Sequence, residues 1–276
     1  MKVGTPINEP RLTIYRPLLS FTITRKQCNM KNLKWPILFL MGISILSPAC
    51  FIDIDDDDNF FGCVNGKGPI VSVDLDMPEI KGINLTLPGE VFITQGSPQS
   101  VRVEAKQNII DELELDVNND GIWVIETDRC VRNIDDFKVF ITIADVTELS
   151  ITGSGDIVSE NFLVVNDLIL RITGSGDLDV GLEADDIDVD ITGSGNMIIE
   201  GTGDSVDARI TGSGDLRAFG LEVNRAKINI SGSGDAEVTV IDELDVRISG
   251  SGDVKYKGNP SIDVTVSGSG RVVDAN

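Results

Sequence analysis

Residues 167–177 read DLILRITGSGD, and this stretch contains the pattern that organises the second half of the chain. Apolar and polar residues alternate up to Ile172, and a Gly-Ser-Gly triplet begins two residues later. Alternation with a period of two and β-branched residues is typical of a strand with one buried face. Glycine adopts positive φ without a Cβ clash, so the triplet predicts a sharp corner at the end of the strand.

The triplet recurs seven times, at intervals of 18 to 21 residues. Its copies begin at Gly153, Gly174, Gly193, Gly212, Gly232, Gly250 and Gly268. From Gly174 onward, apolar residues precede each copy by two, four and six positions, and a second short apolar alternation follows most copies. We therefore expect coils of about 19 residues, each with two or three short strands.

Coils that each bury one narrow apolar stripe are stable only when stacked. The repeats therefore predict an all-β, single-domain parallel β-helix, with corners aligned at the inter-strand spacing of about 4.8 Å. A leucine-rich repeat lacks support because its consensus and its helices are missing, and a β-sandwich would not repeat one corner seven times. Residues 67–150 are more divergent but compatible with the same fold. Gly96 precedes Gly153 by 57 residues, three times 19, which suggests that the coils begin there.

Three segments before the repeats carry a family resemblance: FITQG at 92–96, VRVEA at 101–105 and NII at 108–110. Together with the serial ITGSGD copies they resemble the head GIN domain, a family described as "putative auto-transporter adhesins" that is common in Bacteroidetes and frequently lipidated. The resemblance covers roughly residues 75–270. It implies a right-handed β-helix and a role at the cell surface, and it supplies no catalytic residues.

The composition excludes several classes of function. The 276 residues include no histidine, which excludes Ser-His-Asp and Cys-His catalysis and any zinc site that uses imidazole. Acidic residues outnumber basic ones by 45 to 23, and the pI is near 4.2, which argues against a nucleic-acid partner. Only one of the 45 acidic residues but seven of the 23 basic ones precede Cys50, so a chain that begins at Cys50 has a formal charge of −28.

Residues 30–49 are typical of a secretory signal peptide. Lys31 and Lys34 precede an apolar run over 35–46, which is shorter than the roughly 20 residues of a membrane-spanning helix. The run ends in Leu46-Ser47-Pro48-Ala49-Cys50, which resembles a bacterial lipobox, although the leucine lies four residues before the cysteine instead of three. We expect Cys50 to be lipidated and to begin the mature chain; the alternative is a secreted protein with a free or paired Cys50. Residues 1–29 are then explained by a misassigned start codon.

Residues 50–66 form an acidic linker that contains IDDDDN at 54–59. Like-charge repulsion makes this segment a solvated spacer. The acidic residues also resemble the signal that exports Bacteroidetes lipoproteins to the outer face of the outer membrane. We therefore expect a lipid anchor in the outer membrane with the β-helix, residues 67–276, exposed at the cell surface; the alternative is the periplasmic face.

One polar position follows every triplet, and stacked coils would bring its residues into a column. It is occupied by Asp156, Asp177, Asn196, Asp215, Asp235, Asp253 and Arg271. Carboxylates about 5 Å apart in water repel by about 1 kcal/mol, so the column either binds cations or is relieved by hydrogen bonds in the turns. The five aspartates are weak Ca²⁺ candidates, because Ca²⁺ requires six to eight oxygen ligands. We favour the turn interpretation, in which each carboxylate accepts backbone N–H bonds within its own turn, and we predict no cofactor.

Cys63 and Cys130 are the cysteines that remain after Cys28 and Cys50. In an exported protein they are expected to form a disulfide that staples the N-terminal end of the β-helix; two free thiols are the alternative.

Two classes of function remain. The first is a non-enzymatic surface lipoprotein that presents a β-helical adhesion module to an unknown glycan or protein, with self-association also open. The alternative is a polysaccharide lyase or glycoside hydrolase on the same scaffold, since carboxylates and cations can act without histidine. Two features disfavour the enzyme. After Cys50 only Trp123 and Tyr256 remain of the large polar aromatics that stack on sugars, and the charge would repel polyuronates.

Overall fold

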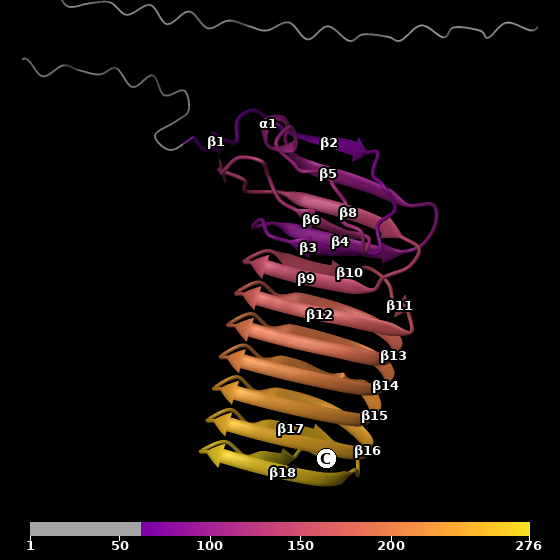
Figure 1. Cartoon of the computed structure of the whole chain (residues 1–276), viewed down its shortest axis with the longest axis vertical. Coiled ribbons are helices and arrows are strands. Elements are labelled where there is room, and N and C mark those ends of the chain that lie inside the picture. Colours follow the sequence, from indigo (N-terminus) through magenta and orange to yellow (C-terminus); the bar gives the residue numbers. More distant parts are fainter. Residues whose placement is uncertain (1–61) are drawn as a thin grey trace, which may run out of the picture. The chain divides into compact units, whose positions relative to one another are not determined.

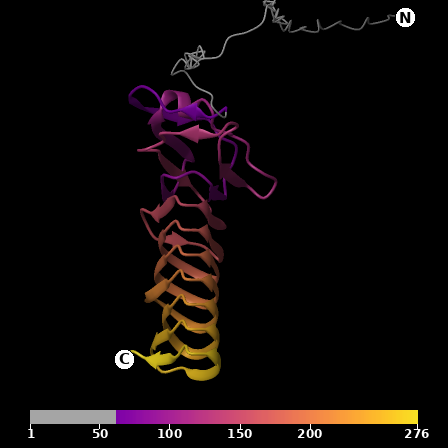
Figure 2. The ribbon, with the colours of Figure 1, turned by 90° about the vertical axis from the view of Figure 1, so that its left-hand side faces the viewer.

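The computed structural model describes residues 62–276, and nearly all of their regular structure is β-strand (Figure 1). From residue 148 onward the strands form parallel coils that stack in chain order (Figures 1 and 2). These strands are β9 (Glu148–Gly153), β10 (Asp156–Ser159), β11 (Leu163–Val164), β12 (Asp167–Gly174), β13 (Leu178–Gly193), β14 (Met197–Gly212), β15 (Leu216–Gly232), β16 (Ala236–Gly250), β17 (Val254–Lys257), β18 (Ser261–Gly268) and β19 (Val272–Asp274). The prediction of a parallel β-helix is confirmed.

The Gly-Ser-Gly corners lie directly over one another, as the repeat predicts. Parallel pairing aligns Gly153 with Gly174, and the same register continues coil by coil to Gly268. Glycine is required there because the backbones of successive corners touch. A Cβ on Gly193, whose φ is +125°, would lie 2.2 Å from the carbonyl oxygen of Gly174.

Apolar columns fill the interior of the coils. The isoleucines two positions before the triplets, from Ile151 to Ile248, stack in register and are buried. Burying one such side chain contributes about 1.5–3 kcal/mol. The strands differ from expectation in length, since β13 to β16 are single strands of 15 to 17 residues. Each coil bends at the edge opposite the triplet, but parallel pairing continues through this bend. Between β13 and β14, for example, Asp185 is the only residue from Leu178 to Gly193, outside the corner, that is left out of the pairing, so the bend does not end the strand.

The first half of the domain is built in a different order from its sequence. β3 (Gly82–Leu85) and β4 (Glu90–Gln95) form a coil that stacks on β9 and β10. On its other side lies a coil made later in the chain, from β6 (Ile122–Ile125) and β8 (Lys138–Ile143). Gly96 therefore does not occupy a triplet corner. It follows β4 and donates its N–H to Ile143, whereas Thr86 lies beside Gly153.

Antiparallel strands close this end of the β-helix. β5 (Ser100–Lys106) runs antiparallel to β8, and β2 (Ile70–Leu75) runs antiparallel to β5. α1 (Gln107–Ile110) follows β5, and β1 (Val64–Asn65) pairs with β7 (Val131–Arg132). We call β1, β2, β5, β7 and α1 the N-terminal cap. The expectation that residues 67–150 continue the coil architecture holds only for β3, β4, β6 and β8.

The expected start codon, signal peptide, lipidated Cys50 and most of the acidic linker lie outside the described residues. Within residues 62–276, no helix has the length and apolar character needed to cross a membrane.

Candidate functional site

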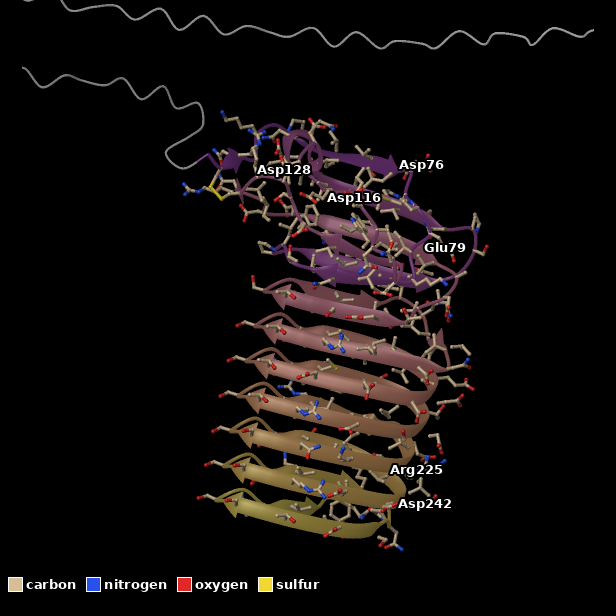
Figure 3. The ribbon with its side chains drawn as sticks, viewed as in Figure 1. Asp76, Glu79, Asp116, Asp128, Arg225 and Asp242 are labelled. Atoms are coloured by element: carbon tan, nitrogen blue, oxygen red, sulfur yellow. A yellow bond between two sulfur atoms is a disulfide. The ribbon has the colours of Figure 1, made fainter. Side chains whose placement is uncertain are left out.

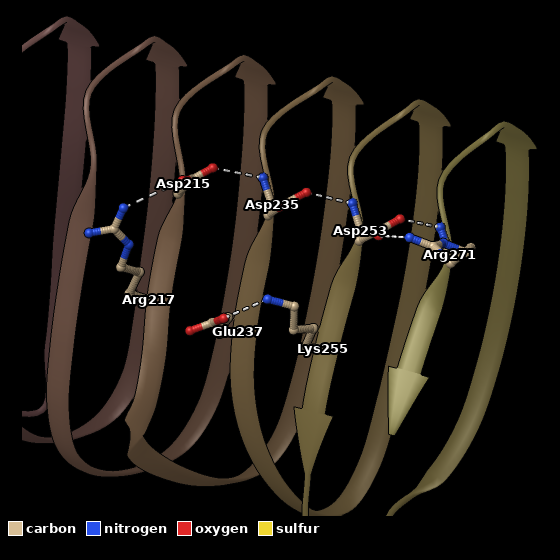
Figure 4. A network of polar contacts seen from close by, with 7 residues as sticks. All are labelled: Asp215, Arg217, Asp235, Glu237, Asp253, Lys255 and Arg271. Carbon is tan, nitrogen blue, oxygen red and sulfur yellow. Dashed lines mark hydrogen bonds and ion pairs between the residues drawn. The ribbon is translucent and has the colours of Figure 1, made fainter. Parts of the chain in front are cut away.

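The column of aspartates at the corners forms a ladder of hydrogen bonds between coils (Figure 4). Oδ1 of Asp215 accepts the backbone N–H of Asp235 at 3.0 Å, and Oδ1 of Asp235 accepts that of Asp253 at 2.7 Å. Asp156, Asp177 and Asp253 bond the next coil in the same way. The turn interpretation placed these bonds within one turn, but the structure shows that each carboxylate joins its coil to the next. We call this column, from Asp156 to Arg271, the aspartate ladder.

Part of the ladder's hydrogen-bonding capacity is used between coils. Each of these five carboxylates already uses one oxygen on a backbone N–H, and Asn196 donates its side-chain amide to Asp177 at 2.9 Å. At the last coil, Arg271 Nη2 lies 2.7 Å from Asp253 Oδ2. This hydrogen bond lowers the pKa of the Asp253 carboxyl from its ordinary value. Among residues 62–276, no three acidic or cysteine side chains gather closely enough to hold a metal ion.

A second set of columns lies on the layer that faces the viewer in Figures 1 and 3, formed by β12, β18 and the C-terminal halves of β13 to β16. One column contains the Thr or Ser residue that directly precedes each triplet. The neighbouring column contains the residue two positions before that Thr or Ser. They line a shallow depression with a volume of about 440 Å³. We name it the hydroxyl–arginine face, and its polar residues are Arg209, Thr211, Lys227, Asn229, Ser231, Arg247, Ser249, Thr265 and Ser267.

The lining of this face differs in composition from the acidic chain as a whole. Its lining includes three cationic side chains and no carboxylate, whereas the chain has a net charge of −22. Lys227 and Arg247 are paired outside the lining, with Asp207 at 2.7 Å and Asp245 at 2.8 Å. The side chain of the exposed Arg209 makes no ion pair or hydrogen bond with any other described residue. Arg209 also lines a neighbouring hollow with Asp188, Asp190 and Asp207, so carboxylates beside the face offset part of its positive charge.

The arrangement supplies groups that can bind polar ligands. Hydroxyl groups both donate and accept hydrogen bonds, and a guanidinium binds a carboxylate through two parallel N–H bonds. Glycoside hydrolysis ordinarily requires a pair of carboxyl groups at the scissile bond. The residues that line the depression do not supply one.

Sequence reasoning missed this face, although a signal was present. The residue before every triplet is Thr or Ser, a constancy stricter than that of the aspartate position, which also contains Asn196 and Arg271. Thr is common on the outward face of strands, so this constancy alone does not indicate a binding face. The three cations could not be grouped from sequence alone, since Lys227 lies on a different column from Arg209 and Arg247.

The structure joins Cys63 to Cys130 in a disulfide with a Cα–Cα distance of 4.4 Å. The bond lies next to the pairing of β1 with β7, in the N-terminal cap. Cys50, the expected lipidation site, lies outside the described residues.

Comparisons with known proteins support the same fold. A family model described as "Putative auto-transporter adhesin, head GIN domain" matches residues 80–260. A crystal structure of a "putative adhesin" from Bacteroides fragilis superimposes with a TM-score of 0.73 at 24% identity, covering 76% of this chain and 99% of that one. A second "putative adhesin", from Parabacteroides distasonis, gives 0.65 at 24% identity, with coverages of 77% and 99%.

A "putative lipid binding protein" from Parabacteroides distasonis gives a TM-score of 0.67 at 23% identity, and covers 77% of this chain and 99% of its own. At these identities the likeness shows the fold. No curated protein matches the chain.

Proposed function

The chain belongs to the head GIN domain family, and from that premise we propose that it is a non-enzymatic binding module at the cell surface. The family description and the names of two of the three similar structures point to adhesion, and the third is named a "putative lipid binding protein". The observation that carries the proposal is the hydroxyl–arginine face, where a column of hydroxyl side chains extends across successive coils beside a column that contains Arg209, Asn229 and Arg247.

The chemistry of the face fits a glycan that bears carboxylates. A glycan offers many hydroxyl groups, which match the Thr and Ser column, and its carboxylates match Arg209 and Arg247. Successive coils repeat the hydroxyl group at about 4.8 Å, so an extended chain can make the same hydrogen-bonding contact several times. Several weak contacts on one polymer raise the overall affinity without any deep pocket.

The binding test uses an array of neutral and acidic glycans probed with the purified protein. We expect acidic glycans to bind, and Arg209→Glu to weaken this binding about 10-fold or more, because it replaces an attractive charge by a repulsive one. Arg217→Glu is the matched control. It makes the same change in charge at an exposed arginine on the opposite layer, where Arg217 lies 3.6 Å from Asp215. Equal losses for both variants, or binding that neither variant affects, would refute the assignment of the face.

We also propose that Cys50 anchors the mature protein to the outer membrane with the β-helix outside the cell. The signal-like segment over 30–49 and the acidic residues after Cys50 support this proposal. The protein should partition with membranes and incorporate a palmitate analogue, and Cys50→Ala should abolish the labelling. Protease added to intact cells should then degrade the β-helix. Labelling that survives in Cys50→Ala would contradict the anchor, and resistance to protease on intact cells would favour the periplasmic face.

A further inference from the structure

The two ends of the β-helix are finished differently. At the N-terminal end, β5 lies antiparallel along β8 and sets Val103 against Val139 and Val101 against Ile141. All four side chains are buried. At the other end, β18 pairs only with β16, and β19 only with β17. Among the described residues, no further strand covers β18 or β19.

The last coil consequently exposes the apolar columns that the other coils bury. Ile262, Val264 and Val266 continue the columns of Leu244, Val246 and Ile248, which are at most 2% exposed. The three residues of β18 are 39–41% exposed, and Val273 on β19 is 38% exposed. All eight residues of β18 are exposed. An edge strand with free backbone groups and an apolar face readily pairs with another strand.

β18 also lacks the charges that protect an edge strand. Asp263 is its only charged residue, whereas the corresponding segment of β13 contains Asp186, Asp188 and Asp190. Its outward positions are otherwise Ser261, Thr265 and Ser267. Proteins ordinarily blunt exposed edges with charged side chains or proline, and β18 has neither along most of its length.

We propose that this end binds a second copy of the chain, through antiparallel pairing of β18 with β18 of the partner about a two-fold axis at Val264. In this register Ile262 faces Val266 of the partner subunit, and Asp263 faces Thr265 of the partner subunit. The inner columns then meet across the interface, and no carboxylate opposes another. Moving the axis to Asp263 would set two aspartates against each other, and a shift by one residue would turn the apolar residues outward.

The fold itself supports this geometry and this stoichiometry. The N-terminal cap shows that an antiparallel strand can continue the stack, because β5 does so on β8. A two-fold axis perpendicular to the two layers brings β18 against β18 of the partner. The same axis brings β19 against β19 of the partner. The other end finishes in β2, which pairs only with β5 and so also leaves one edge unpaired among the described residues. The two-fold contact uses β18 of both copies, so it is isologous and closes as a dimer. This inference is independent of the ligand proposed above.

The register is tested by a single cysteine in the full chain. Val264→Cys places two thiols opposite each other across the axis, within the Cα–Cα range of about 4.4–6.8 Å that a disulfide requires. Mild oxidation should therefore give a dimer on a non-reducing gel. Ser261→Cys is the control, because its copies would lie about 20 Å apart in this register. Failure of Val264→Cys to form a cross-link, or equal cross-linking by both variants, would overturn the register.

The interface is tested by light scattering on the detergent-solubilised chain at several concentrations. We expect the mass of a dimer, and the mass of a monomer for Val264→Lys, which sets two ammonium groups against each other in an apolar contact. Val164→Lys changes another exposed valine, on β11, and should remain dimeric. A monomeric wild type, a dimer that survives Val264→Lys, or a complex in which this end holds a different protein would each overturn the proposal.

Discussion

Gly193 illustrates how one residue type determines the corner of every coil. Its positive φ is unfavourable for other residues, and the carbonyl of Gly174 leaves no room for a Cβ. Ser194, in the middle of the same triplet, is exposed, and its backbone N–H bonds the same carbonyl. The two glycines of the triplet are thus fixed by geometry, whereas the serine side chain is free to vary.

Gly193→Ala should lower the free energy of unfolding by about 3 kcal/mol or more, through backbone strain together with the clash. Ser194→Ala should change it by less than about 0.5 kcal/mol, because the backbone bond remains. Denaturant unfolding of the two variants measures both values. Similar losses would mean that the hydroxyl, and not the backbone approach, determines the corner.

Substitutions in the aspartate ladder distinguish a hydrogen-bonding role of its carboxylates from a cation-binding role. Asp235→Ala removes the acceptor for the N–H of Asp253 and should cost about 1 kcal/mol. Asp235→Asn keeps an acceptor oxygen and reduces repulsion along the column, so stability should change by less than about 0.5 kcal/mol.

Calcium should raise the melting temperature of the wild type no more than sodium chloride of equal ionic strength. A rise specific to calcium that Asp235→Asn abolishes would make the ladder a metal site.

Asp253 gives the ladder a defined dependence on pH. Its hydrogen bond from Arg271 lowers the carboxyl pKa from its ordinary value of 3.8 in the folded state. The ionised pair therefore stabilises the protein above the pKa of the unfolded chain, and this contribution disappears as the pH falls through the lowered folded pKa.

Arg271→Ala should raise the Asp253 pKa towards 3.8, which NMR titration of the carboxyl carbon would measure. The stability difference from wild type should be full near neutral pH and shrink under acid. A difference that grows as the pH falls would contradict the account.

At the scale of elements, the sequence predicts the repeated coils well and the N-terminal cap poorly. The period of two and the invariant triplets define β12 to β18 because each coil contacts only its neighbours. β3 and β4 lack a triplet and stack between strands that come later in the chain, so their pairing depends on long-range contacts that no local pattern reveals. The aspartate column was predicted as a column, but the direction of its bonds between coils required coordinates.

The disulfide constrains the β1–β7 pair of the N-terminal cap. We expect the stability of the coils not to depend on this bond. Replacing Cys63 and Cys130 by serine should destabilise the cap by about 2–4 kcal/mol. Hydrogen exchange should accelerate in β1 and β7, whose pairing adjoins the bond, and remain unchanged in β13 to β16. Accelerated exchange throughout the stack would show that the cap nucleates the whole β-helix.

At the scale of the whole molecule, regular stacking converts a 19-residue repeat into a surface. The same register that aligns the buried isoleucines aligns Thr211, Ser231 and Ser249 on the outside. Bends at the opposite edge carry their own contacts, such as that between Arg225 and Asp204 at 2.5 Å (Figure 3). The fold thus presents flat columns of polar groups on this face, which suits binding of an extended ligand.

NMR mapping of the glycan that binds best in the array tests this account most directly. Its titration should shift the amide signals of Thr211, Ser231 and Ser249 together with the side-chain signals of Arg209 and Arg247. The signals of the aspartate ladder and of Arg217 should remain in place. Shifts centred on the ladder, on the opposite layer or on β18, with the hydroxyl–arginine face unaffected, would contradict the central claim.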